Sequence, residues 1–221
     1  MSLRIILSFF LFVITFNGYA QLLKIDTVLD KRIYESYFNL KLKEPLYVTY
    51  TLFKGGGNCD REDEGFNFFV DGFKMSATDQ DYAGSGFDKG HLANAEDFAF
   101  ECEYEELTFR YYNCVPQTVR MNRGIWKKWE TDVRKLSQTK KILIVAGSIF
   151  GKKKLGDNKI GIPSHCYKIV IDPGTKKILH CLVFPNNNSN TFQVVTFTEL
   201  KQRLGYRLIP TQFWKSVSQK N

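Results

Sequence analysis

The strongest chemical signal lies around His91, in a segment rich in glycine and charge. The run from Ser85 to His91 reads SGFDKGH, so the histidine directly follows Gly90. Imidazole exchanges a proton near neutral pH, and a loop histidine of this kind can serve as a general base. His165 and His180 fall in strand-like segments, and for both we predict structural roles.

A second signal comes from residues 122–136, which have the apolar spacing of an amphipathic helix. Asn122 lies in line with the apolar stripe at its N-terminal end, where a buried polar side chain needs a partner. It could cap the helix or hold a ligand. Glu130 flanks the stripe and could form a surface ion pair with Arg134, four residues on. The stripe itself consists of Ile125, Trp126, Trp129, Val133 and Leu136.

These residues occur in a characteristic order. A DKGH motif ends at His91, and an NCVPQ motif begins at Asn113. Asn122 and Glu130 then follow. This order resembles the DNA/RNA non-specific endonucleases, over about residues 45–210. The resemblance implies an α+β fold with a ββα-metal (His-Me finger) core, in which a central, mainly antiparallel sheet is flanked by helices.

The resemblance also implies a mechanism of phosphodiester hydrolysis that leaves 5′-phosphates. His91 would take a proton from the attacking water, and Asn122 would hold Mg²⁺, for which Mn²⁺ could substitute. Glu130 would orient metal-bound waters. Asn113 would position the phosphate or the base, and Arg134 would stabilise phosphate charge.

Three positions near His91 refine this expectation. Lys89 stands where the family usually has arginine, so it keeps the charge but loses bidentate geometry, and we expect a weaker hold on the phosphate with activity retained. Asn94 stands where a proline is frequent, which we interpret as a local loop change. Asp88 is interpreted as an organiser of the loop, not as a metal ligand.

Composition agrees with a polyanionic partner. The 221 residues include 31 basic and 23 acidic side chains, for a net charge of +8, and 43% are hydrophobic, which argues against disorder. The basic residues are dispersed along the sequence and no base-reading motif is evident. We therefore predict cleavage of both DNA and RNA with little sequence preference and strong inhibition by salt.

Two alternatives remain open. The fold could be catalytically inactive and bind nucleic acid through charge alone, which metal-dependent cutting would exclude. The match could also be accidental in an unrelated basic domain. A structure tests that second alternative by showing whether His91 and Asn122 come together.

The N-terminus has the pattern of a secretory signal peptide over residues 1–20. Arg4 precedes an apolar stretch from 5 to 16, and small residues end at Ala20, where we predict cleavage. An uncleaved anchor is the alternative. One endonuclease domain is predicted over residues 22–215, exported to the periplasm or the medium, with no membrane association after cleavage and an open oligomeric state.

Local patterns predict the main elements. Strands are expected at 46–52, 107–114 and 141–150, a short one at 68–71, a hairpin from 167–171 and 178–184, and a helix at 198–204. The acidic cluster at 101–106 is expected to form a solvated turn. The five cysteines allow one or two disulfides, and Cys166 could face Cys181 if Ile171 faces Lys176 across the hairpin.

Overall fold

The computed structural model describes residues 22–208, whose centre is a seven-stranded antiparallel sheet in the order β1-β2-β3-β6-β7-β8-β9. A separate two-stranded sheet pairs β4 with β5. The strands of the large sheet are β1 (Thr27–Asp30), β2 (Glu35–Asn39), β3 (Glu44–Leu52), β6 (Ile142–Leu155), β7 (Ile160–Asp172), β8 (Lys177–Pro185) and β9 (Gln193–Val194). The predicted signal peptide at 1–20, and residues 209–215 of the predicted domain, lie outside the described residues.

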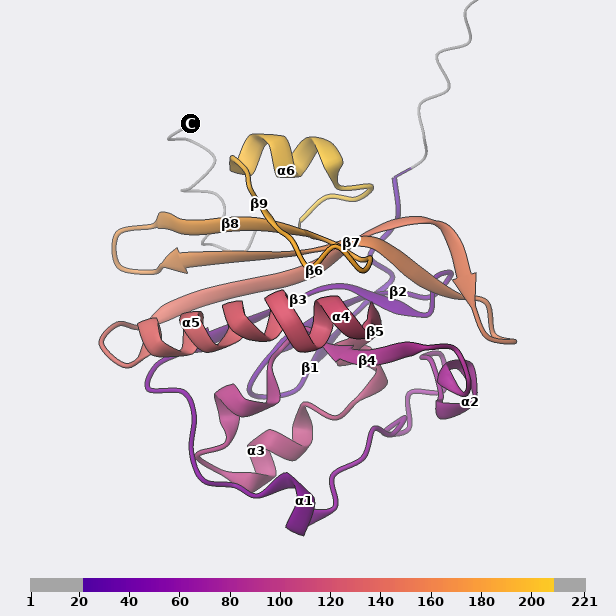
Figure 1. Ribbon diagram of the computed structural model, residues 1–221, viewed down its shortest axis with the longest axis horizontal. Coiled ribbons are helices and arrows are strands. Elements are labelled where there is room, and N and C mark those ends of the chain that lie inside the picture. The colour runs from indigo at the N-terminus through magenta and orange to yellow at the C-terminus, as the bar shows by residue number, and fades with distance from the viewer. Residues whose placement is uncertain (1–21, 209–221) are drawn as a thin grey trace, which may run out of the picture.

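The large sheet is buried on both faces, which explains the near-continuous apolar runs in its central strands. Figure 1 shows α5 (Lys127–Ser137) along one face and α6 (Phe197–Arg203) over the other. Alternation in β6 sends Ile144 into the core beneath α5 and Val145 into the core beneath α6. The strands expected at 46–52 and 141–150, the hairpin and the helix at 198–204 are confirmed.

The small sheet and the helix after it form one continuous ββα unit. Strand β4 (Phe87–His91) pairs antiparallel with β5 (Cys114–Thr118), so that His91 lies opposite Cys114. The chain then runs through α4 (Val119–Met121) and a π-helical turn (Asn122–Trp126) into α5. Trp126 and Val133 bury the predicted apolar stripe against the sheet. The expected α+β arrangement with a ββα core is confirmed.

Several local expectations are wrong because tertiary contacts override local pattern. Residues 107–114 form no strand before Cys114, since a 3-10 turn occupies Tyr111–Asn113, and residues 68–71 make one isolated bridge, between Phe69 and Arg110. The acidic cluster forms helix α3 (Cys102–Leu107). Glu105 in this helix is fully buried, where it forms an ion pair with Arg61.

The disulfide joins Cys59 to Cys102, and Cys166 and Cys181 are buried free thiols. Cys166 pairs with Phe184, while Cys181 pairs with Ile169, so the two sulfurs are not opposite each other. A register irregularity between Val170 and Ile171 contributes to this difference, because a shifted register changes every facing pair in a hairpin.

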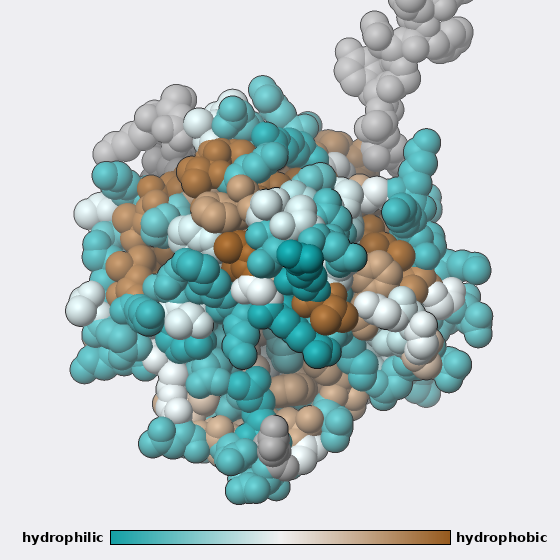
Figure 2. Space-filling view, in the orientation of Figure 1, coloured by the Kyte–Doolittle hydropathy of each residue, from teal (hydrophilic) through white to brown (hydrophobic). Residues whose placement is uncertain are grey.

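Two short helices complete the fold: α1 (Arg61–Glu64) and α2 (Asp79–Tyr82), with a further 3-10 turn at Ala95–Phe98. No helix among residues 22–208 is both long and apolar enough to cross a membrane. The face shown in Figure 2 is mainly hydrophilic, and its hydrophobic patches are small and separate.

Candidate functional site

A polar cleft of about 500 Å³ lies beside the start of the ββα unit. Strand β4, helix α2 and the π-helical turn form its walls. It is lined by Asp79, Tyr82, Ala83, Phe87, Asp88, Lys89, Asn122 and Arg123. Two of the predicted site residues, Lys89 and Asn122, therefore share one cleft, together with the predicted loop organiser Asp88.

Asn122 is oriented by Asp88. Its Nδ2 donates to Oδ2 of Asp88 at 2.9 Å. Arg123 donates to the same carboxylate through Nε and Nη2, at 2.9 and 2.8 Å. Burial raises the pKa of Asp88, but the hydrogen bonds from Arg123 and Asn122 outweigh it, and the pKa lies below its usual value. Asp88 is thus held as an anion that organises its neighbours.

Asn122 is not the cap of the helix. The helical segment begins after Thr118, and Asn122 already has right-handed helical torsions of −58° and −54°. Because its amide nitrogen donates to Asp88, Oδ1 is the side-chain atom of Asn122 that remains able to accept or to bind a cation. An amide oxygen is a suitable ligand for Mg²⁺, which retains several waters. No group of three or more His, Cys, Asp or Glu side chains in residues 22–208 could hold a metal ion. The fit therefore rests on Asn122.

The π-helical turn sets the direction of Asn122. The N–H of Lys127 donates to the carbonyl of Asn122, five residues back. The amide of Ile125 donates to Oδ1 of Asn190 at 2.7 Å, and Gly124 has non-helical torsions of −105° and −106°. Inserted π turns recur at functional sites because they redirect side chains within a helix.

The loop that supplies Asn190 also holds the end of β5. Oδ1 of Asn186 accepts from the amide of Thr118 at 2.8 Å, and its Nδ2 donates to the carbonyl of Pro116 at 2.8 Å. Sequence reasoning missed this loop, although its asparagine-rich composition at 186–190 was a visible signal. Asparagine is favoured where a chain needs local polar bonding or a positive φ, and Asn190 has a φ of 55°.

His91 ends β4 between two aromatic rings. Its ring centroid lies 4.7 Å from that of Phe68 and 4.8 Å from that of Phe109. The residue as a whole is partly exposed, but Nε2 is covered and has no hydrogen bond. Burial lowers the pKa of His91 to about 3, assisted by the charge of Arg61. The imidazole is therefore neutral at physiological pH, as a proton acceptor must be.

His91 and Asn122 belong to the same ββα unit, but no described contact joins their side chains. Asn122 bonds to Asp88, three residues before His91 on β4. Lys89 connects the two regions, since it lines the cleft and its ammonium lies 5.6 Å from the ring of Phe68, which packs on His91. The structure thus places both on one short strand-and-helix scaffold.

Lys89 is paired within the cleft. Its ammonium forms an ion pair with Asp79, and the hydroxyl of Tyr111 donates to the same carboxylate at 2.6 Å. The hydrogen bonds from Lys89 and Tyr111 hold the pKa of Asp79 below its usual value. Lysine offers a point charge here, so Asp79 and a phosphate would compete for it.

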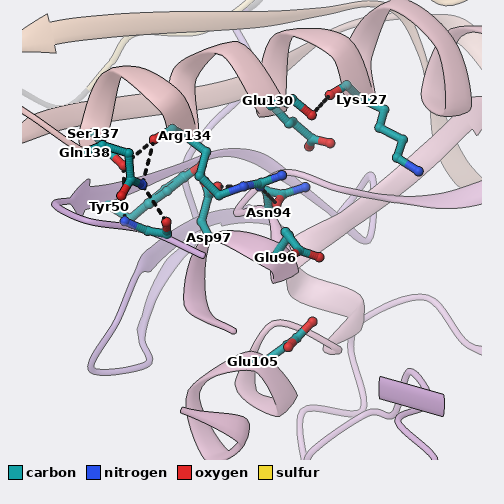
Figure 3. A network of polar contacts seen from close by, with 12 residues as sticks. Tyr50, Asn94, Glu96, Asp97, Glu105, Lys127, Glu130, Arg134, Ser137 and Gln138 are labelled. Atoms are coloured by element: carbon teal, nitrogen blue, oxygen red, sulfur yellow. Dashed lines mark hydrogen bonds and ion pairs between the residues drawn. The ribbon is translucent and has the colours of Figure 1, made fainter. Parts of the chain in front are cut away.

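Glu130 and Arg134 do not form the surface ion pair that their spacing suggested. Figure 3 shows Arg134 directed at Asn94 and Asp97, to which Nη1 donates at 3.0 and 2.9 Å. Glu130 is 6% exposed, and its Oε1 lies 3.8 Å from Nζ of Lys168. Burial raises the pKa of Glu130 to about 7, although Lys168 opposes the shift. Both side chains therefore belong to a network of buried polar groups, which Arg134 connects to the segment that follows His91.

Asn113 is also used inside the protein. It is fully buried, its Oδ1 accepts from the amide of Ala93 at 2.9 Å, and its Nδ2 donates to the carbonyls of Ala93 and Thr108. The expectation that it touches phosphate or base is not met, because both N–H groups are engaged away from solvent. Asn113 instead fixes the backbone two residues after His91.

Arg61 and Phe68 were not identified from sequence. Arg61 lies close enough to His91 to lower its pKa, and it is held by Glu105 and Glu96 at 2.8 and 2.6 Å. Neither residue lies in a recognisable motif, so no local signal could have marked them.

Comparisons with known proteins agree with this geometry. A family model described as DNA/RNA non-specific endonuclease matches residues 17–207. Mitochondrial nuclease EXOG of Xenopus laevis is 35% identical over 110 residues, which are 44% of this chain and 31% of the relative. Human mitochondrial endonuclease G is 31% identical over 144 residues, 58% of this chain and 47% of the relative.

Two further similarities extend the picture. A nuclease of Nostoc sp. is 36% identical over 121 residues, 52% of this chain and 43% of that protein. A solved structure of the EndoG/EndoGI complex matches with a TM-score of 0.76 at 22% identity, over 87% of this chain and 88% of the other. That likeness shows a shared fold. The matched segment spans 31–47% of the length of the three curated relatives.

Proposed function

Because the chain belongs to the DNA/RNA non-specific endonuclease family, we propose that it is a metal-dependent hydrolase that cuts the phosphodiester bonds of DNA and RNA. The products would carry 5′-phosphates. The observation that carries the proposal is the cleft in which Asp88 fixes the amide nitrogen of Asn122 and leaves the amide oxygen available as a ligand.

The residues fit one Mg²⁺, or Mn²⁺ in its place. Asn122 would hold it through Oδ1, and Asp88 would keep the amide from flipping, a role of the kind that outer-sphere partners play around metal ligands. When bound, the ion would offset the negative charge that develops on the phosphate and on the leaving oxygen.

His91 supplies the proton acceptor. The neutral imidazole takes a proton from a water molecule, whose oxygen forms a bond to phosphorus while the bond from phosphorus to the 3′ oxygen breaks; the 3′ oxygen takes a proton from solvent and leaves as a hydroxyl. Nε2 of His91 is covered and has no hydrogen-bond partner in this structure, so in this proposal the substrate and its water must reach the partly exposed histidine. Asn113 keeps the following backbone in place through Ala93.

Cationic groups would hold the substrate. Lys89 lies in the cleft and can exchange its contact with Asp79 for one with a phosphate. Arg134 supports the segment after His91 through Asn94, and in this proposal it contributes charge from beneath the site.

We further propose export to the periplasm or the medium. The support is the pattern of residues 1–20 and the disulfide between Cys59 and Cys102, a bond that forms in oxidising compartments. Two of the relatives are named as mitochondrial proteins, and that location is a property of those proteins, which we do not transfer to this chain.

The test is cleavage of supercoiled plasmid and of RNA by the mature protein with Mg²⁺. We expect nicking that EDTA, His91→Ala and Asn122→Ala each abolish, and that His165→Ala, on β7, leaves intact. Direct measurement of Mn²⁺ binding should show a loss of affinity for the ion in Asn122→Ala and wild-type affinity in His91→Ala. If the protein binds plasmid but cuts it with none of the divalent ions tested, the alternative of a catalytically inactive protein that binds polyanions would be supported instead.

A further inference from the structure

A group of lysines that form no salt bridge within residues 22–208 surrounds the tip of the β6–β7 hairpin. The hairpin carries Lys152, Lys153, Lys154 and Lys159 on the sequence GKKKLGDNK, and a neighbouring turn carries Lys41 and Lys43. We call these residues the lysine surface. The basic residues therefore are not all dispersed in space, as the sequence suggested, because the fold gathers two distant segments.

One backbone and one side-chain hydrogen bond bring those segments together. The amide of Gly161 donates to the carbonyl of Leu42 at 2.9 Å, and Nζ of Lys43 donates to Oδ1 of Asn158 at 3.1 Å. Lys41 is also close enough to Lys154 to contribute to the lowering of its pKa, for which burial is the larger cause. Like charges are thus held near one another, which costs energy unless an anion binds.

The lysine surface has no internal compensation of the usual kind. Lys152, Lys153 and Lys159 are exposed, and within residues 22–208 no salt bridge includes any of the lysine-surface side chains. Elsewhere in the described chain Lys31, Lys89 and Lys140 each form an ion pair with an aspartate. Glu44 attracts Lys154, and the other lysines of the surface present positive charge to solvent without an ion-pair partner in the described chain.

The lysine surface adjoins helix α2, which lines one side of the candidate cleft. Asn158, at the hairpin tip, donates to both carboxylate oxygens of Asp81 in α2, at 3.1 and 3.0 Å. Asp79 and Tyr82, in the same short helix, line the cleft. Figure 1 shows the hairpin tip and α2 side by side at one edge of the molecule. One helical turn separates the lysines from the site.

We propose that the lysine surface is a second nucleic-acid contact, which binds backbone phosphates of the substrate beside the scissile bond. This inference rests on the proposed function and extends it. Lysine ammonium groups are point charges that contact phosphate without reading bases, so the surface would raise affinity for long polyanions without adding sequence preference. A long duplex carries phosphates on both sides of the scissile bond, whereas a trinucleotide carries few phosphates beyond it.

The test compares two triple variants that remove the same charge. The hairpin variant combines Lys152→Gln, Lys153→Gln and Lys159→Gln. The control variant combines Lys141→Gln, Lys176→Gln and Lys177→Gln, which are exposed lysines just before β6 and at the turn between β7 and β8. Lys154 is left intact because its charge lies near buried Glu44.

Binding to a DNA duplex of about 30 base pairs is measured by anisotropy in EDTA, from about 50 to 200 mM salt. We expect the slope of log K against log salt to fall by about 2–3 in the hairpin variant, at about 0.9 per lost phosphate contact, and affinity to fall about 10- to 100-fold. The control variant should change affinity less than about threefold, as expected for unspecific loss of net charge.

Cleavage separates this proposal from the function itself. The hairpin variant should cut long duplex with a raised KM, yet cut a trinucleotide at the wild-type rate. Equal losses of duplex affinity in both variants, or an unchanged slope of log K against log salt in the hairpin variant, would refute the proposed role of the lysine surface. Neither result would affect the nuclease proposal. Loss of binding to anionic lipid vesicles with unchanged duplex binding would assign the surface to a membrane instead. A wild-type protein that cuts nothing would refute the proposed function, while duplex binding would still test the surface.

Discussion

The π-helical turn at Asn122 depends on a close contact between Gly124 and Asn190, and this contact can be tested by a double-mutant cycle. A Cβ added at Gly124 would lie 2.2 Å from Oδ1 and 2.9 Å from Cγ of Asn190. Such distances require the side chain of Asn190 to leave its position, and with it its hydrogen bond to Ile125, or the loop or the helix to move. Overpacking of this kind costs about 1–3 kcal/mol, and we expect Gly124→Ala to lower the free energy of unfolding by that amount.

Asn190→Gly removes the obstacle and one hydrogen bond. Glycine accepts the φ of 55° at this position without strain, while the amide of Ile125 loses its bond to Oδ1. A typical hydrogen bond contributes about 0.5–1.5 kcal/mol, so the variant should lose about 1 kcal/mol. Without the Asn190 side chain, the new Cβ of Gly124→Ala has no atom to clash with. The double variant should therefore have nearly the same free energy of unfolding as Asn190→Gly alone.

Urea denaturation provides the energies, and Mn²⁺ binding provides a readout specific to the site. The two substitutions should be non-additive by about 1–3 kcal/mol, and Gly124→Ala should weaken Mn²⁺ binding because the turn sets the direction of Asn122. Asn188→Gly, at an exposed position in the same loop, is the control. Additivity within about 0.5 kcal/mol would refute the reasoning.

Two further predictions concern ionisation and the disulfide. The folded pKa of Glu130 is raised from 4.5 to about 7, so its contribution to stability is complete below pH 4.5 and is lost as pH rises to about 7. Unfolding measured at several pH values should show this decline in the wild type relative to Glu130→Gln, and parallel curves would contradict the burial argument. The Cys59–Cys102 bond spans a sequence separation of 43, for which loop-closure entropy predicts a stabilisation of about 4 kcal/mol. Reductant should lower the urea midpoint of the wild type, and a variant with Cys59→Ser and Cys102→Ser should already be low and insensitive to reductant, whereas an unchanged midpoint would exclude the stabilisation.

Features that depend on neighbours in sequence could be predicted from the sequence. Periods of 3.6 and 2 residues, and long apolar runs, are local consequences of burying one face or both, so the helix after Asn122 and the strands at 46–52 and 141–150 were predictable. The order of the DKGH and NCVPQ motifs was enough to place His91 and Asn122 in one ββα unit. Local reasoning failed where packing decides, as at Glu105, which is buried in a helix rather than solvated in a turn.

The site itself was partly predictable. Residue types identified His91, Lys89 and Asn122. They did not show that Asn113 binds the backbone of Ala93, or that Glu130 lies on the buried side of α5, next to Lys168. Such roles depend on which polar groups lose water on folding, and burial depends on the whole arrangement of the chain.

The amino-acid sequence by itself determined the family, the ββα unit and the types of chemistry that its side chains offer. Only the tertiary structure decided the partners: Asp88 with Asn122 and Arg123, Cys59 with Cys102, and Asn190 with the turn that carries Asn122. It also joined the turn at 41–43 to the hairpin at 152–159 and set the tip of that hairpin against helix α2, which lines the cleft. The physical reason is that periodicity is a local property of the chain, whereas these contacts close long loops and form when the buried faces of distant elements pack together.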